Sequence, residues 1–207
     1  MPRMRIVCVS DTHGGHRGLT VPDGDLLVHA GDITRHGELD TVADFDRWLG
    51  DLPHPHKVVI CGNHDFAFQE RPHAARALVT NAHYLEDASV TVGGLTVYGS
   101  PWQPWFGGWA FNRERGPALA AVWAKIPDRT DVLVTHGPPA GLLDRTSRGE
   151  LVGCRDLFDR VMEVRPRLHV FGHIHEAAGR LDVDGTTFVN ASCFDGRGGP
   201  VVVEWDA

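Results

Sequence analysis

Potential metal ligands recur at five separated turns of this chain. The turns read DTH at residues 11–13, GD at 31–32, GNHD at 62–65, THG at 135–137 and GHIH at 172–175. The paired histidines of the last turn need further ligands to hold a cation, and the other four turns offer them. The candidate ligands are Asp11, His13, Asp32, Asn63, His136, His173 and His175.

This ligand set suits two cations better than one. Two carboxylates, one amide oxygen and four imidazoles are too many for a single tetrahedral ion with an open position. They fit two ions that share a bridging carboxylate, for which Asp32 is the natural choice. No thiolate is offered, so we expect two divalent ions, Mn²⁺ first, with Fe or Zn²⁺ as alternatives.

Two such ions would support hydrolysis of a phosphate ester. Ions about 3.5 to 4 Å apart lower the pKa of a bridging water and hold the phosphoryl oxygens while the resulting hydroxide attacks. His64 is adjacent to Asn63 but is not needed for coordination. We therefore expect His64 to protonate the leaving group as a general acid.

Each of the five turns follows a short apolar run. The runs cover residues 5–10, 25–30, 57–61, 131–135 and 168–171 and predict strands buried on both faces. Apolar spacing of three and four predicts helices over 37–52, 75–81, 118–126 and 155–164. Strand and helix alternate, which favours an α/β fold whose strand ends gather the candidate ligands in one crevice.

Two segments break this alternation. Residues 89–100 and 179–192 each predict a β-hairpin, around Gly93 and Gly94 and around Asp184 and Gly185. With the apolar run at 200–206, these strands are enough for a second sheet. We expect one domain over residues 1–207, a sandwich of two sheets with helices outside.

Composition excludes some classes of partner. The net charge of -7 argues against duplex nucleic acid, because neutralisation of phosphates supplies most of that affinity. No segment approaches the roughly 20 apolar residues of a membrane span, and the N-terminal apolar run is too short for a signal peptide. The four cysteines are neither paired nor clustered, so we expect buried, reduced thiols in a cytoplasmic protein.

Each motif taken alone also has a structural interpretation that involves no metal. A single GD or one histidine at a strand end is usually an ordinary turn residue. Five motifs in order, each after an apolar strand, favour the metal site instead. The other histidines lack such support and are predicted to be surface or packing residues: His16, His29, His36, His54, His56, His73, His83 and His169.

The five motifs together resemble the pattern of the calcineurin-like metallophosphoesterase superfamily. The similarity is greatest to its MPPED (metallophosphoesterase-domain-containing) branch, through stretches such as residues 98–116, 135–145 and 166–176. The resemblance implies a four-layer α/β/β/α sandwich of two mixed sheets flanked by helices. It implies a first metal on Asp11, His13, Asp32 and His175, a second on Asp32, Asn63, His136 and His173, and His64 as the catalytic histidine.

Two departures from the superfamily pattern matter. Protein phosphatases of the superfamily carry GDxVDRG, whereas residues 31–37 read GDITRHG, which argues against protein phosphatase activity. Asp65 is predicted to orient His64 in place of the missing aspartate. Some mammalian members of the branch have glycine where this chain has His173, and they are weak enzymes. A complete second site, with corresponding activity, is expected here.

The segment 99–116 is rich in aromatic residues and has two interpretations. It is either a loop packed on the core or a wall on which a nucleobase stacks, with Arg113 or Arg115 reaching phosphate. The predicted substrate-binding residues are Asn63, Trp102, Trp105 and Arg113. They suggest a small phosphate ester, a nucleotide, as the substrate.

Three functions remain open at this point. The first is a phosphodiesterase that acts on small nucleotide phosphodiesters, cyclic ones included. The second is a phosphomonoesterase, nucleotidase or nuclease that uses the same metals. The third is a non-catalytic metal-binding regulatory module, whose expected signature, a missing ligand or a replaced His64, is not seen.

Overall fold

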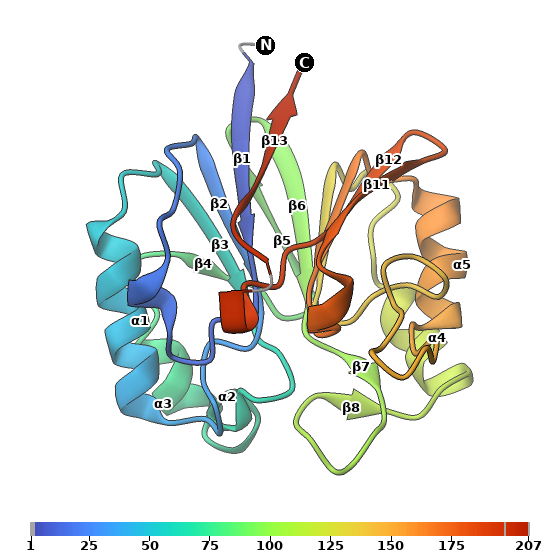
Figure 1. Cartoon of the computed structure of the whole chain (residues 1–207), viewed down its shortest axis with the longest axis horizontal. Helices are drawn as coiled ribbons and strands as arrows, with labels where there is room; N and C mark the ends of the chain where they lie inside the picture. Colours follow the sequence, from blue (N-terminus) through green and yellow to red (C-terminus); the bar gives the residue numbers. More distant parts are fainter. Residues whose placement is uncertain (1–2, 197, 207) are drawn as a thin grey trace.

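Two β-sheets pack face to face in the computed structural model, which describes residues 3–196 and 198–206 (Figure 1). The first sheet has the order β13-β1-β2-β3-β4, with β1 (Met4–Val9), β2 (Leu26–Ala30), β3 (His56–Ile60), β4 (His83–Tyr84) and β13 (Val201–Trp205). The second has the order β11-β12-β10-β9-β6-β5, with β5 (Ala88–Val92), β6 (Leu95–Ser100), β9 (Val132–Thr135), β10 (Leu168–Phe171), β11 (Gly179–Val183) and β12 (Thr186–Asn190). Both sheets are mixed.

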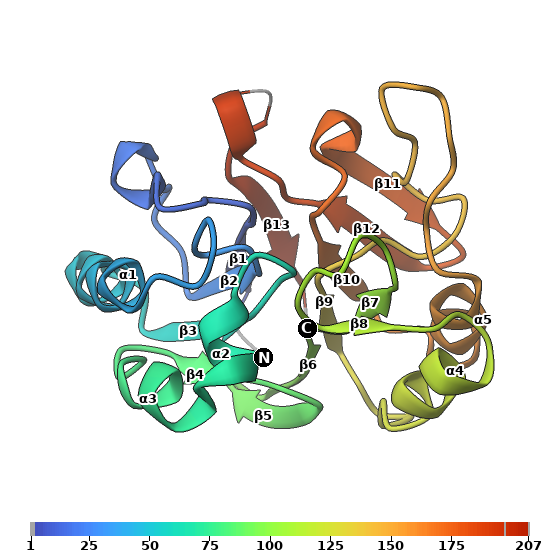
Figure 2. The ribbon, with the colours of Figure 1, turned by 90° about the horizontal axis from the view of Figure 1, so that it is seen from below.

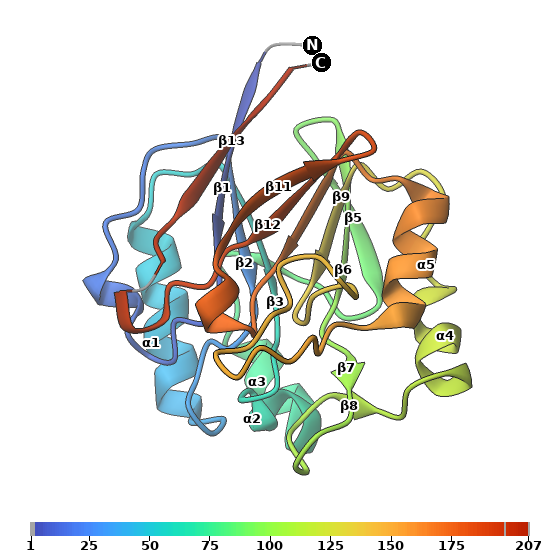
Figure 3. The same cartoon turned by 45° about the vertical axis from the view of Figure 1, so that its right-hand side comes forward.

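Helices cover the outer face of each sheet. The first sheet is covered by α1 (Leu39–Asp51), α2 (Phe66–Glu70) and α3 (Pro72–Ala77). The second is covered by α4 (Pro117–Trp123) and α5 (Arg155–Val164), which come forward in Figure 3. The predicted four-layer α/β/β/α sandwich is confirmed.

Three apolar cores explain why the strands read as continuous apolar runs. One core lies between the sheets and includes Ile6, Val28 and Val170. A second lies under α1 and includes Phe45, and a third lies under α4 and α5 and includes Trp123. Because each sheet has a core on both faces, successive strand residues are buried in both directions. All four cysteines are free and buried, as predicted.

The strands that precede the five turns are parallel within each sheet. β1, β2 and β3 pair in parallel in the first sheet, as do β9 and β10 in the second. Their carboxyl ends therefore meet at one edge of the sandwich, away from the two chain ends. Figure 2 views the molecule from below and looks onto this edge, where the connecting loops gather.

Some predicted elements differ from the structure. The C-terminal strand β13 pairs with β1 in the first sheet rather than joining the second. The helix predicted over 75–81 is α3, which begins at Pro72 because proline suits the first turn of a helix. Helix α2 and the short strands β7 (Gln103–Pro104) and β8 (Asn112–Arg113) were not predicted. The other three helices and both hairpins are confirmed.

Among residues 3–196 and 198–206, no helix combines the length and the apolar character that crossing a membrane requires.

Candidate metal centre

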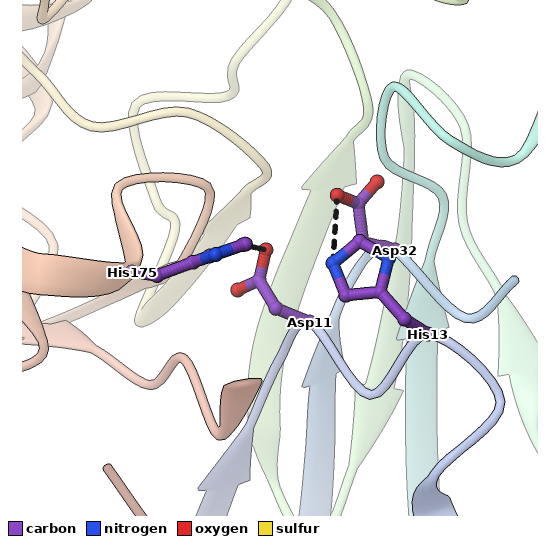
Figure 4. Close-up of side chains that lie close together, drawn as sticks. All are labelled: Asp11, His13, Asp32 and His175. Carbon is purple, nitrogen blue, oxygen red and sulfur yellow. Dashed lines mark hydrogen bonds and ion pairs between the residues drawn. The ribbon is translucent and has the colours of Figure 1, made fainter. Parts of the chain in front are cut away.

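Four of the predicted ligands form a compact cluster at the sheet edge. Asp11, His13, Asp32 and His175 offer ligand atoms that all lie within 4.8 Å of one another (Figure 4). Asp11 and His13 follow β1, Asp32 follows β2 and His175 follows β10, so both sheets contribute. His175 Nε2 lies 3.2 Å from Asp11 Oδ1. This is the set that the resemblance assigned to the first metal.

The remaining predicted ligands adjoin the first group. His136 Nε2 lies 2.9 Å from Asn63 Oδ1 and 3.4 Å from Asp32 Oδ1. The His173 ring lies 5.1 Å from the His136 ring, and the His173 amide donates to both oxygens of Asp11 at 3.1 Å. All seven predicted ligands thus surround one centre.

Asp32 faces both groups. Its Oδ2 lies 3.6 Å from His13 Nε2, and its Oδ1 lies 3.4 Å from His136 Nε2. One carboxylate therefore presents a different oxygen to each candidate metal position. This geometry agrees with the bridging role predicted for Asp32.

His13 provides a direct test of whether the residues fit a cation. Its Nδ1 donates to Thr34 O at 3.2 Å, which leaves Nε2 as an unprotonated, buried nitrogen without a hydrogen-bond partner among the described residues. Burial lowers the pKa of His13 and favours this neutral form. A buried lone pair that faces carboxylates fits a divalent cation, and the hydrogen bond at the other nitrogen fixes the ring for that role.

Without a bound cation, the Asp32 carboxylate favours a protonated His136. Burial opposes ionisation, but the Asp32 carboxylate outweighs it and raises the pKa of His136 to about 9. In return, and against the effect of burial, the charge of His136 holds the pKa of Asp32 below its ordinary value. A cation between these residues would replace that proton, as metal ligands must be deprotonated.

The backbone at the centre is held in an unusual conformation. Four candidate ligands have positive φ angles: Asp11 (56°), His13 (44°), Asp32 (56°) and His173 (68°). Non-glycine residues in this region cost about 1–3 kcal/mol each and tend to cluster at functional sites. The four strained residues of this chain named above all lie at the candidate metal centre, in agreement with that tendency.

Gly172 leaves the space that Asp11 occupies. A Cβ atom at residue 172 would lie 2.1 Å from Asp11 Oδ2 and 2.2 Å from Ser10 Oγ. Gly62 similarly leaves space for Asp32, since a Cβ there would lie 2.2 Å from Asp32 Oδ1. The glycines of the GHIH and GNHD turns are therefore required by close approach of a buried carboxylate.

Replacing Gly172 with alanine should weaken cation binding by more than about 10-fold, because the methyl group would displace Asp11. Calorimetric titration with Mn²⁺ measures this effect. Gly18→Ala is a matched control, since a Cβ at residue 18 meets nothing within 4 Å. Equal affinity in both variants would exclude Asp11 as a ligand.

His64 stands beside the cluster at its solvent side. Its Nδ1 donates to Arg35 O at 2.7 Å, which turns Nε2 toward the centre, 3.9 Å from Asp32 Oδ2. Its ring lies 4.5 Å from that of His13 and 4.2 Å from that of Trp109. The side chain is 23% exposed, so it can meet a substrate and remain oriented.

The prediction that Asp65 orients His64 is wrong. The partner of His64 Nδ1 is Arg35 O, whereas the buried Asp65 carboxylate accepts hydrogen bonds from the amides of Ile33, Thr34 and Gly62. Asp65 therefore ties the 31–37 turn to the 62–65 turn. Burial, together with the charge of Asp32, raises the pKa of Asp65 to about 6.

The aromatic residues of segment 99–116 that lie beside the centre are not the ones that we predicted to bind substrate. Trp102 donates through Nε1 to Asp87 Oδ2 at 3.2 Å, and the Arg113 guanidinium lies 4.0 Å from the Trp102 ring. The Trp102 ring is thus held by contacts within the protein, and the assignment of Trp102 and Arg113 to substrate binding stays a prediction. The rings beside the centre are Trp109, next to His64, and Phe106, 5.1 Å from His173.

The Gly107-Gly108 pair explains why Phe106 and Trp109 reach the centre. Both glycines have positive φ angles, 53° and 71°, and they form a tight turn between the two aromatic residues. The GG pair in the sequence was the signal that could have located the tip of the segment.

Among the residues that the structure describes, candidate ligands line two cavities beside the centre. One of about 350 Å³ is lined by His173 together with Trp105, Phe106, Pro138, Val152 and Ile174. Trp105, a predicted substrate-binding residue, is 57% exposed at its wall. A second cavity of about 180 Å³ is lined by His13, Thr12, Arg35 and Phe194.

Comparisons with known proteins give a matching family model and several similar sequences. Residues 4–177 match a family model described as calcineurin-like phosphoesterase. The chain is 46% identical to human Metallophosphoesterase domain-containing protein 1 over 91% of its own length and 65% of that relative's. It is 41% identical to a UPF0046 protein of Caenorhabditis elegans, over 92% of this chain and 70% of that protein. It thus spans about two thirds of the length of these relatives.

A solved structure shares the fold. TT1561 of Thermus thermophilus superposes with a TM-score of 0.61 at 14% identity, over 91% of this chain and 89% of that one.

Proposed function

Because this chain belongs to the calcineurin-like phosphoesterase family, we propose that it is a metal-dependent phosphodiesterase that hydrolyses small nucleotide phosphodiesters, cyclic ones included. The family predicted from the five motifs is thereby confirmed. The observation that carries the proposal is the convergence of the predicted ligands around Asp32, with His64 beside them.

The side chains of the centre would hold two divalent cations, with Mn²⁺ expected first. Asp11, His13 and His175 lie on one side of Asp32, and Asn63, His136 and His173 lie on the other. When bound, two cations supply Lewis-acid activation of water and neutralise phosphoryl charge. The hydrogen bonds from His13 to Thr34 O and from His136 to Ala30 O keep Nε2 of each ring directed at the centre.

His64 is placed to move a proton. The hydrogen bond from Nδ1 to Arg35 O leaves Nε2 as the atom that faces a bound phosphoester. A proton on Nε2 would pass to the departing ester oxygen, so that the alcohol leaves neutral rather than as an alkoxide. The Trp109 ring, 4.2 Å away, limits rotation of the imidazole.

The two cavities favour a diester as the substrate. One is lined by His173 and the other by His13, so they approach the centre from different candidate ligands. An acyclic phosphodiester carries two organic groups, for which two such spaces are available, whereas a monoester carries one. The exposed Trp105 and the neighbouring Phe106 offer ring faces to a nucleobase in the larger cavity.

With Mn²⁺, the purified protein should hydrolyse bis(p-nitrophenyl) phosphate with a kcat/KM at least about 10-fold above that for p-nitrophenyl phosphate. The reason is that the second p-nitrophenyl group of the diester adds an apolar contact with the protein. Steady-state kinetics on both esters checks this. A preference for the monoester would identify a phosphomonoesterase. Failure to hydrolyse either ester, with both ions bound, would identify a non-catalytic metal-binding module.

A further inference from the structure

The larger cavity is apolar in its lining and begins at the candidate metal centre. Trp105, Phe106, Val152 and Ile174 contribute apolar side chains, and His173 forms its inner end. A phosphoryl group held at the centre would direct one of its organic substituents past His173 into this space.

Two polar side chains of the lining, Arg115 and Thr146, make hydrogen bonds within the protein. Arg115 donates to Gly153 O at 2.8 Å and to Val152 O at 2.7 Å. Thr146 Oγ1 accepts a hydrogen bond from the Glu150 amide at 3.2 Å. These hydrogen bonds brace the wall of the cavity. Because most of the side chains that line it are apolar, the cavity offers mainly apolar contact and shape.

The walls are held in place before any ligand binds. Arg115 joins the aromatic segment to the loop that contains Val152. Asp144 closes that loop by accepting hydrogen bonds from the amides of Gly141, at 2.9 Å, and Gly153, at 3.0 Å. The Ser147 amide also donates to Glu176, next to the candidate ligand His175. A preformed cavity of this kind loses little entropy on binding and discriminates by fit.

We infer that this cavity is a specificity site for a flat, apolar substituent of the phosphoester, recognised by its ring faces and not by the hydrogen-bonding edge of a particular base. The inference rests on the proposed function and makes it more specific. Aryl esters and nucleotides would bind better than small alkyl esters. Adenine and guanine nucleotides would bind alike, because stacking and apolar contact act on the ring faces that both bases present.

Binding of unreactive phosphomonoesters to the Mn²⁺-loaded protein tests the inference by calorimetry, independently of turnover. Phenyl phosphate should bind at least about 10-fold more tightly than methyl phosphate, and 5′-AMP and 5′-GMP should agree within about 10-fold. Val152→Trp should fill the cavity and bring the phenyl-to-methyl ratio close to 1. Leu151→Trp is the matched control, since Leu151 is 59% exposed on the same loop and does not line the cavity.

Trp105→Ala provides a second variant that should not disturb folding, since Trp105 is 57% exposed. This variant should bind phenyl phosphate more weakly than the wild type does and bind methyl phosphate with unchanged affinity. An unchanged phenyl-to-methyl ratio in either cavity variant would overturn the inference. A difference above about 10-fold between 5′-AMP and 5′-GMP would also overturn it, because the two bases present similar ring faces and differ at their hydrogen-bonding edges. Failure of the proposed function is distinct, since catalysis would then be absent while the binding ratios remain.

Discussion

Asp32→Asn should lose bound cations and lower phosphodiester hydrolysis by more than about 100-fold. Changes to groups that merely orient a metal ligand already cost about 10- to 100-fold in metal affinity or activity, and Asp32 would be a direct ligand for two ions. Its two oxygens face His136 and His13 at 3.4 and 3.6 Å. Asparagine keeps the shape but provides one neutral oxygen and no charge, so it cannot serve both positions.

Metal analysis of the purified variant and thermal unfolding with and without Mn²⁺ measure this loss. Cation binding should stabilise the wild type by about 2.7 kcal/mol when free Mn²⁺ is 100 times Kd. The variant should show no such Mn²⁺-dependent gain. Asp182→Asn is a suitable control, because Asp182 is a surface carboxylate paired with Arg180. Two ions per chain in Asp32→Asn would exclude a shared carboxylate.

The metal centre could be predicted from the sequence because of how parallel strands are arranged. Apolar runs marked the strands β1, β2, β3, β9 and β10, and the side chains after them had to gather at one edge. No knowledge of strand order was needed for this step. The order of the strands was harder to predict from the sequence. Strand β13 pairs with β1 although the two are the last and the first strands of the chain. An apolar run alone does not specify its partner.

The substrate side of the centre was harder to predict because loop conformation decides it. Trp102 and Trp109 have the same residue type and lie in the same segment, yet Trp102 packs against Arg113 and Trp109 against His64. The wall that contains Val152 belongs to a loop without apolar periodicity. Asp65 was assigned to His64 because of sequence adjacency, whereas the actual acceptor, Arg35 O, is a backbone group that no residue type identifies.

His64→Ala should retain both cations and lower kcat by about 10²- to 10⁴-fold on a diester with a poor leaving group. Ligand positions should persist, because the interaction that His64 makes with Asp32 Oδ1 comes from its backbone amide, at 2.9 Å, which alanine keeps. The loss should be confined to proton transfer at Nε2. A phenyl or alkyl ester needs that proton as its oxygen departs.

Two esters with different leaving groups distinguish proton donation by His64 from binding of the phosphoryl group by His64. Methyl p-nitrophenyl phosphate and methyl phenyl phosphate share the retained group and differ in how much protonation their departure requires. His64→Ala should lose much more activity on the phenyl ester, because p-nitrophenolate leaves readily as an anion. His36→Ala is a matched control, since His36 is an exposed histidine whose ring lies 6.0 Å from that of His64. If His64→Ala lost equal activity on both esters with both ions bound, His64 would hold the phosphoryl group and not donate the proton. If the ions were lost, His64 would belong to the ligand set.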